Sequence, residues 1–285
     1  MLRVTQITEL RQIISAQKRL GKSIAFVPTM GYLHRGHLSL VDYAKGDGVF
    51  IVMSLFVNPM QFGPKEDFTK YPRDLARDAE MAEKAGVDLL FYPDVAEMYP
   101  QPVLSYIDID GLAGVLCGAS RPGHFRGVCT VVGKLFNIVQ ADKSYFGQKD
   151  YQQYLIIKRM AADLNFAVEV IAAPIVREDD GLAMSSRNVY LSPVQRTEAL
   201  VLNRSLAKAE LEIRNGQRDA RAIEEMIKEQ IIQESSGQID YVEVRDATDL
   251  TGLEKIKGKV LIALAVRFGT TRLIDNKVVE VEENV

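Results

Sequence analysis

The chain has little of what marks secreted, membrane-bound or nucleic-acid-binding proteins. Of its 285 residues only Cys117 and Cys129 are cysteines, too few and too far apart for a CxxC pair or a zinc framework. Two free thiols fit a reducing compartment, and the simplest role for both is that of small core residues. Basic and acidic residues nearly balance, 35 against 38, for a net charge of -3. That balance excludes a general electrostatic attraction to nucleic acid or to an anionic membrane.

Long hydrophobic runs are also missing from the sequence. The longest, at 49–57 (VFIVMSLFV), is interrupted by Ser54 and is far shorter than the roughly 20 residues that a membrane-spanning helix needs. The first residues carry leucine and isoleucine at helical spacing, without the continuous apolar stretch of a secretion signal. We therefore expect a cytoplasmic protein. The hydrophobic fraction of 47% is that of a globular chain, with room for one large or two modest domains.

Strand-like and helix-like segments alternate up to about residue 175. The run at 49–57 is apolar at nearly every position, as expected for a parallel strand that is buried on both faces. Residues 72–86 place apolar side chains on one face of a helix, with proline near its start and glycine at its end. The alternation predicts an α/β fold with a doubly wound, Rossmann-like parallel sheet. The predicted strands are 23–27, 49–57, 88–92, 143–146 and 167–171, and further predicted helices are 128–139 and 151–164.

The pattern changes after Ser192. The tetrapeptide 192–195 (SPVQ) is a capping box with proline at the first helical position, which predicts a helix to about residue 214. A second helix at about 219–233 and three strands follow, which predicts a smaller α+β domain with antiparallel pairing. We place the boundary so that domain 1–176 binds the ligand and domain 177–285 acts as a lid. The strands expected in the second domain are 239–244, 260–266 and 272–274.

The strongest functional signal lies between the first long predicted strand and the helix after it, in the segment 28–37 (PTMGYLHRGH). Ligands of open α/β sheets bind at the carboxyl ends of strands, so the position suits a binding site. Gly31 permits a tight turn, Gly36 lets a phosphate approach the backbone, and the helix start offers unpaired N–H groups. His34 and His37 lie three residues apart and can face the same phosphate oxygens. The alternative is that this HxxH pair is structural or binds a metal.

The segment resembles the HIGH signature of the nucleotidyl-transferring superfamily that includes the class I aminoacyl-tRNA synthetases. Its longer form, PTMGxLHxGH, is similar to that of the pantothenate synthetase family (pantoate–β-alanine ligases that form AMP). Further segments match the same family along nearly the whole first domain, whereas the second domain resembles the family only in length and coarse pattern. These segments are 56–62 (FVNPMQF), 121–128 (RPGHFRGV), 146–153 (FGQKDYQQ) and 177–188 (REDDGLAMSSRN).

The resemblance implies an enzyme that binds ATP and joins (R)-pantoate to β-alanine in two steps. The pantoate carboxylate attacks the α-phosphate of ATP, which gives pantoyl adenylate and pyrophosphate. The amine of β-alanine then attacks the activated carbonyl, which gives pantothenate and AMP. The family depends on Mg²⁺, carried mainly by the ATP phosphates, and is usually a homodimer. Because a carboxylate and a triphosphate repel each other, catalysis must consist of positioning and electrostatic neutralisation.

Three residues suit that neutralisation: His34, His37 and Lys149. His37 matches the family's proton donor, and Lys149 follows a predicted strand within GQKD, although a lone lysine is usually a solvated surface charge. Asp150 is placed to cap the next helix or to contact the ribose, and Gln148 departs from the glutamate that the family more often has. The residues implied to contact ATP are Met30, Gly31, Tyr32, Leu33, His34, Arg35, Gly36, His37, Gly147, Gln148, Lys149, Asp150, Val176, Met184, Ser185, Ser186 and Arg187.

A site for pantoate and β-alanine is implied by the same resemblance. Gln61 and Gln153 match the pantoate-binding glutamines, and an amide offers both the donor and the acceptor that a hydroxy acid needs. Asn58 would be a metal or pantoate neighbour, although an Asn-Pro dipeptide indicates a turn first. His124 lies in a loop between two arginines, and three cations so close would guide an anionic substrate. No residue set in the sequence identifies a metal site.

Residues 184–187 (MSSR) occupy the place of the superfamily's mobile KMSKS loop, although its lysines are missing. Two hydroxyls and a guanidinium can still hold β- and γ-phosphates, and a polar interdomain loop is the plainer interpretation. Three other functions stay open: a nucleotidylyltransferase with a stable nucleotidyl product, a nucleotide-binding module without catalysis, and a tRNA-binding relative. The two glutamines argue against the first, the intact histidines and lysine against the second, and the net charge against the third.

Overall fold

The computed structural model describes residues 1–285 except 47, 65, 67 and 282–285. Six parallel strands form its larger sheet, in the order β1-β4-β3-β2-β5-β6, which confirms the predicted parallel sheet. The strands are β1 (Leu2–Val4), β2 (Ser23–Thr29), β3 (Val49–Leu55), β4 (Leu89–Phe91), β5 (Lys143–Gly147) and β6 (Glu169–Ala173). The helices of this part are α1 (Ile7–Arg19), α2 (Arg35–Ala44), α3 (Leu75–Ala85), α4 (Val95–Met98), α5 (Cys117–Ser120), α6 (His124–Val139) and α7 (Tyr151–Asp163).

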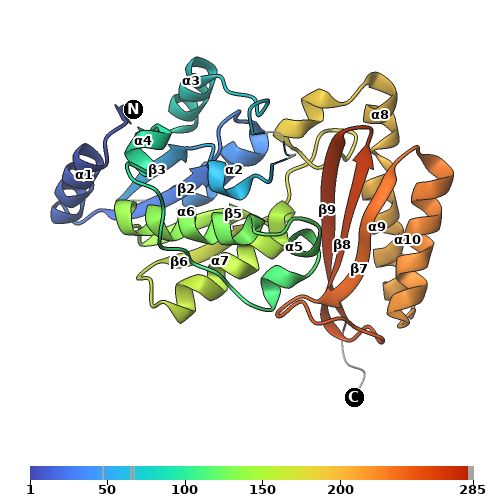
Figure 1. Ribbon diagram of the computed structural model, residues 1–285. Helices are drawn as coiled ribbons and strands as arrows, with labels where there is room; N and C mark the ends of the chain where they lie inside the picture. The colour runs from blue at the N-terminus through green and yellow to red at the C-terminus, as the bar shows by residue number, and fades with distance from the viewer. Residues whose placement is uncertain (47, 65, 67, 282–285) are drawn as a thin grey trace.

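Helices cover both faces of this sheet (Figure 1). Because successive strand residues point to opposite faces, Phe26 and Val52 join the core made with α1, α6 and α7. Their neighbours Val27 and Met53 join a second core, made with α2 and α3. The strands are therefore buried on both sides, as their continuous apolar runs predict. Among the described residues, no helix has the length and apolarity needed to cross a membrane.

The strand order reverses between β2 and β5. The helix after β2 packs on one face of the sheet, and the helix after β5 packs on the other. Both strands run parallel, so the turns that follow Thr29 and Gly147 open at the same edge. Such a switch point is where open α/β sheets bind ligands.

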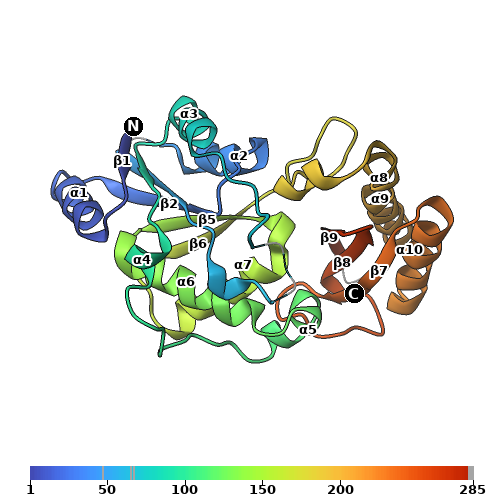
Figure 2. The same ribbon diagram turned by 45° about the horizontal axis from the view of Figure 1, so that its top comes forward.

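The C-terminal part forms a three-stranded antiparallel sheet in the order β7-β8-β9. Helices α9 and α10 pack on one face of it (Figures 1 and 2). The opposite face meets the first part of the chain, where Leu261 and Ala263 pack with Leu116 and Leu155. Its elements are α8 (Pro193–Glu198), α9 (Val201–Arg214), α10 (Ala220–Glu234), β7 (Gln238–Asp246), β8 (Gly258–Phe268) and β9 (Thr271–Val281).

Some element boundaries differ from the predictions. The single helix expected from the capping box to residue 214 is two helices, because the N–H of Leu202 bonds the carbonyl of Ala199, three residues back, and tightens the chain between them. The helix expected at 72–86 begins at Leu75, since the Asp74 carboxylate caps it through the N–H of Arg77 at 3.1 Å. The short strand β1 was not predicted. The strand expected at 272–274 is far longer, as polar side chains within it are buried at the domain contact.

Candidate active site

A cavity of about 210 Å³ opens where β2 and β5 end. It brings the motif histidines, the lysine after β5, the loop at 184–187 and two glutamines to one place. The predicted site residues that line it are Met30, His34, Gly36, His37, Gln61, Gly147, Lys149, Asp150, Gln153, Val176, Met184, Ser185, Ser186 and Arg187. The predicted residues that do not line it are Gly31, Tyr32, Leu33, Arg35, Gln148, Asn58 and His124.

A buried carboxylate holds the turn that carries the two histidines. Gly31 and Tyr32 both have positive φ, 83° and 49°, which confirms the predicted tight turn. Asp78 of α3 accepts hydrogen bonds from the backbone N–H groups of Tyr32 and Leu33, each at 2.7 Å. Burial raises the pKa of Asp78, and these two hydrogen bonds partly oppose that effect. Asp78 is not recognisable as a site residue in the sequence, because helical spacing marks it only as one polar position of α3.

His34 and His37 lie stacked at the start of α2, with ring centroids 4.0 Å apart. The Nδ1 atom of His37 accepts the backbone N–H of His34 at 3.3 Å, so a neutral His37 carries its proton on Nε2. Burial, His34 and Lys149 lower the pKa of His37 well below its usual range, and burial and Lys149 lower the pKa of His34 to about 4. Both imidazoles are uncharged at neutral pH. They offer hydrogen bonds and dipoles, and their part in neutralising the charge of a bound triphosphate stays a prediction.

The surroundings of His34 are shaped to its ring. A Cβ atom at Gly36 would lie 3.0 Å from the imidazole, so this glycine makes room for His34 in addition to its predicted role toward phosphate. Nδ1 of His34 is buried and has no hydrogen-bond partner within the part of the chain that the structure describes. An unpaired buried nitrogen is costly, and a ligand group that supplies the missing hydrogen bond would be favoured there.

Lys149 lies in a 3-10 turn, η3 (Gln148–Asp150), between β5 and α7. Its side chain is 20% exposed, with Nζ 3.7 Å from the carboxylate of Asp150. Asp150 occupies the N-cap position of α7, as one of its two predicted roles requires, but its side chain makes no capping hydrogen bond there. The space beside Gly147 is open, since a Cβ there would meet nothing within 4 Å. The turn therefore presents an ammonium group beside backbone that a phosphate can approach.

The loop at 184–187 is supported by an aromatic residue from a distant segment. Ser185 accepts the N–H of Arg187 at 3.2 Å and caps a 3-10 turn, η4 (Ser186–Tyr190). The Ser186 hydroxyl lies 3.0 Å from that of Tyr71, and the Arg187 guanidinium lies over the Tyr71 ring at 5.7 Å. Tyr71 was not singled out in the sequence, where it lies outside every matched segment. Both serine hydroxyls already have partners, so the loop is held in shape by one contact within it and by its contacts with Tyr71.

Asn58 is a buried residue that contacts the side chain of Gln61. It is 1% exposed, and its Nδ2 donates to the side-chain oxygen of Gln61 at 3.2 Å and to the carbonyl of Gly127 at 3.1 Å. Its Oδ1 accepts from a backbone N–H and from the hydroxyl of Tyr99 at 2.9 Å. The predicted turn is confirmed as the 3-10 turn η1 (Pro59–Gln61). With both ends of its amide engaged, Asn58 orients Gln61 within this structure.

His124 contacts the backbone of Gln61. Its Nδ1 donates to the Gln61 carbonyl at 2.8 Å, and its Nε2 accepts from Arg121 at 2.9 Å. Burial and the Arg121 charge lower the pKa of His124 to about 4. Arg121 is paired with Glu66 at 2.7 Å, and Arg126 lies over a tyrosine ring at 3.9 Å. The expected group of three cations therefore contains two, because His124 is neutral, while the guanidinium groups of Arg121 and Arg126 keep their charge but are engaged in other contacts. A contact of His124 with substrate stays a prediction.

Residues 3–278 match the family described as pantoate-beta-alanine ligase. The chain belongs to this family. It is 65% identical to the pantothenate synthetase of Desulfitobacterium hafniense over 280 residues, which are 98% of this chain and 99% of that one. The crystal structure of pantothenate synthetase from Thermus thermophilus matches with a TM-score of 0.92 at 46% identity, covering 97% of this chain and 99% of that one. The pantoate-beta-alanine ligase of Francisella tularensis, solved with beta-gamma ATP and beta-alanine, matches with a TM-score of 0.81 at 32% identity, covering 98% and 97%.

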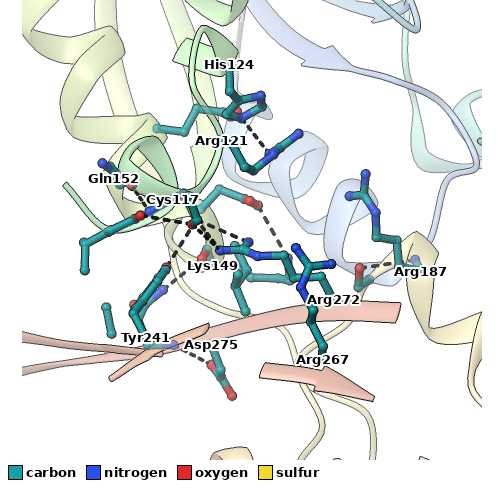
Figure 3. A pocket seen from close by; sticks show the side chains of 18 of the residues that line it. Cys117, Arg121, His124, Lys149, Gln152, Arg187, Tyr241, Arg267, Arg272 and Asp275 are labelled. Atoms are coloured by element: carbon teal, nitrogen blue, oxygen red, sulfur yellow. Dashed lines mark hydrogen bonds and ion pairs between the residues drawn. The ribbon is translucent and has the colours of Figure 1, made fainter. Parts of the chain in front are cut away.

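In this member of the pantoate–β-alanine ligase family, a larger cavity of about 890 Å³ lies between the parallel sheet and the C-terminal sheet. It shares Lys149, Asp150, Gln153, Ser185 and Arg187 with the smaller cavity, so the two spaces adjoin. Figure 3 shows that side chains of both parts of the chain face it. The site is thus completed by residues of the C-terminal sheet, which sequence spacing did not point to.

Cys117, Tyr241 and Arg272 form a polar cluster in the lining of this larger cavity. The Cys117 sulfur lies 3.2 Å from the Tyr241 hydroxyl and 3.5 Å from the Arg272 guanidinium (Figure 3). Arg272 also pairs with Asp240 at 2.7 Å. The prediction of two core cysteines is confirmed, because Cys117 and Cys129 are both buried members of the core that includes α6. Cys117 lies at the edge of this core, where its sulfur also contacts polar groups of the domain contact.

Proposed function

We propose that this chain ligates (R)-pantoate and β-alanine to pantothenate through a pantoyl adenylate, releasing AMP and pyrophosphate. The observation that carries the proposal is the meeting of two kinds of group in one cavity. Lys149 and the two imidazoles suit a triphosphate, and the amides of Gln61 and Gln153 suit a hydroxy acid. The names of the relatives, pantothenate synthetase, support the same reaction.

In the first step, the chain's residues bring two anions together. When the pantoate carboxylate attacks the α-phosphorus, it approaches the negatively charged triphosphate. The positive charge of the Lys149 ammonium offsets the repulsion between these two anions. The Nε2–H of neutral His37 donates to a phosphate oxygen, because its Nδ1 is occupied by the backbone N–H of His34. The unpaired Nδ1 of His34 accepts from, or in its other tautomer donates to, a group of the bound substrates. Each such donor typically contributes about 100-fold or more to the rate.

In the second step, the amine of β-alanine attacks the acyl carbon and AMP leaves. Gln61 lines the cavity beside His34 and His37, and its orientation is set by Asn58. We place the carboxylate and hydroxyls of pantoate on Gln61 and Gln153. A reactive acyl adenylate must be kept from water, and the C-terminal sheet that borders the larger cavity is positioned to exclude it. We propose accordingly that residues 1–176 bind the substrates and residues 177–285 act as a lid.

Mg²⁺ belongs to the proposal through its chemistry with ATP. Within the described residues, no group of three or more His, Cys, Asp or Glu side chains could hold a metal ion. Mg²⁺ is commonly bound by one carboxylate together with substrate phosphates, and Asp150 is a carboxylate of this cavity. The residues thus fit an ion held by the triphosphate and Asp150. When bound, it would reduce the negative charge of the phosphates.

The test is to incubate the protein with ATP, Mg²⁺, (R)-pantoate and β-alanine and to identify the products, omitting each substrate in turn. We expect AMP, pyrophosphate and pantothenate only with the complete mixture. Lys149→Ala should lower kcat by about 100-fold or more. The exposed Lys45, paired with Asp42 at the end of α2, supplies the control Lys45→Ala, which should keep full activity. A nucleotidylated product without AMP, or ATP binding without turnover, would contradict the proposal.

Two further properties are part of the proposal. We propose a cytoplasmic enzyme, supported by two buried and unpaired cysteines, which suit a reducing compartment. We also propose a homodimer, which rests on the resemblance to the family. Light scattering coupled to size-exclusion chromatography should give twice the mass of 31.8 kDa, and a single-chain mass would contradict it.

A further inference from the structure

Strand β9 of the C-terminal sheet contacts the turn that carries Lys149. Asn276 of this strand is 5% exposed, and its side-chain Nδ2 donates to two backbone carbonyls of the turn. The distances are 2.9 Å to the carbonyl of Gln148 and 2.8 Å to that of Lys149. The buried side-chain amide of Asn276 therefore donates to two successive backbone carbonyls of η3, across the contact between the C-terminal sheet and the first domain. A hydrophobic side chain at this point of β9 would leave both carbonyls without this donor.

The residue before Asn276 fixes the strand at this point. Asp275 has a side chain that is 1% exposed and pairs with the Arg177 guanidinium through both oxygens, at 2.7 and 3.0 Å. Its Oδ1 also accepts the backbone N–H of Asn276 at 2.8 Å. Arg177 donates further to the carbonyl of Gly181, in the hairpin that leads to the loop at 184–187. The dipeptide Asp275–Asn276 thus contacts both segments that border the smaller cavity near Lys149.

We propose that Asn276 is a positioning residue for Lys149, through which the C-terminal sheet sets the place of the catalytic ammonium group. The inference rests on the proposed function of Lys149 at the ATP phosphates. A 3-10 turn of three residues has few hydrogen bonds of its own, so two bonds from a rigid strand restrict where its backbone lies. A lysine held in this way offers its charge at one place, and a misplacement of about 1 Å costs on the order of 100-fold in rate.

The experiment compares Asn276→Asp and Asn276→Ala with the wild type in the pantoate-dependent exchange of pyrophosphate into ATP. Asn276→Asp keeps the shape but turns an acceptor toward two carbonyl oxygens. We expect kcat to fall about 10- to 100-fold in both variants. The KM for ATP should change less, since a loss confined to the transition state appears in kcat. Lys277→Ala, the next residue of β9, removes an ion pair with Glu210 of α9 and should leave kcat unchanged.

A double-mutant cycle separates positioning from a general structural role. If Asn276 acts through Lys149, Asn276→Ala should lower kcat in the wild type but hardly change the remaining activity of Lys149→Ala, because the two effects then do not add. An equal fold loss in both backgrounds would overturn the inference, as would unchanged kcat in Asn276→Ala. Should Asn276→Asp fail to fold, Asn276→Ser, which retains one donor, must give an intermediate kcat. A wild type that forms no pantothenate would refute the proposed function instead, and the two failures are therefore distinct.

Discussion

The removal of the Asp78 carboxylate should weaken both the fold and the site. In Asp78→Ala, the N–H groups of Tyr32 and Leu33 lose acceptors at 2.7 Å each, and a buried donor without a partner costs about 1–3 kcal/mol. The two lost hydrogen bonds together cost about 2–6 kcal/mol. Part of this cost is regained, because burial raises the pKa of Asp78 and the variant no longer has to bury an ionised carboxylate. We expect a loss of about 2–4 kcal/mol in the free energy of unfolding. Asp78→Asn keeps one acceptor and should lose about half as much.

Chemical denaturation at pH 7 measures the loss, and the pantothenate assay reports the site. His34 follows Leu33 directly, so a relaxed turn displaces the imidazole, and kcat should fall about 100-fold in the folded variant for a shift of about 1 Å. Glu80→Gln is the matched control, because Glu80 lies on the exposed side of the same helix and pairs only with Lys84 among the described residues. Wild-type stability and kcat in Asp78→Ala would refute the reasoning that this carboxylate holds the turn.

Two further changes test other contacts. Gly127→Ala places a Cβ against the carbonyl of Met60 and 2.7 Å from the backbone nitrogen of Gln61. We therefore expect a loss of about 1–3 kcal/mol in stability and a raised KM for pantoate. An unchanged KM would contradict the role of this backbone contact in placing Gln61. The pKa of His34 and of His124 is lowered to about 4 in the folded protein, whereas an unfolded histidine has a pKa of about 6.5. The free energy of unfolding is therefore highest above about pH 6.5. It falls by about 3 kcal/mol for each histidine as the pH drops toward 4, because only the unfolded chain takes up the proton in that range. Nuclear magnetic resonance titration of the ring protons measures both values, and a midpoint near 6.5 for either histidine would contradict its neutral, buried state.

Most of the elements and the place of the site were predictable because their signals are local. Apolar runs such as 49–57 indicated strands buried on both faces, and the capping box at Ser192 indicated a helix start, which the structure confirms with the side-chain hydrogen bond to Gln195. The glycine and histidine pattern after β2 indicated a tight turn, confirmed by the positive φ of Gly31. Capping, turn and periodicity act within one or two turns of chain, so they can be recognised without knowing what packs against them.

The details that depend on distant contacts were decided only by the tertiary structure. The neighbouring places of β2 and β5 bring His34 and Lys149 into one cavity, and strand pairing across so long a separation leaves no local pattern. The charge of His124 was mistaken, because a pKa depends on burial and on neighbours such as Arg121 that only packing reveals. Asp78 and Asn276 were missed for the same reason: each is an ordinary polar residue in sequence, and its partners are backbone groups of a remote turn. The sequence by itself determined the family, most of the elements and most of the residues that line the smaller cavity, whereas packing decided their charge states and the groups that hold them in place.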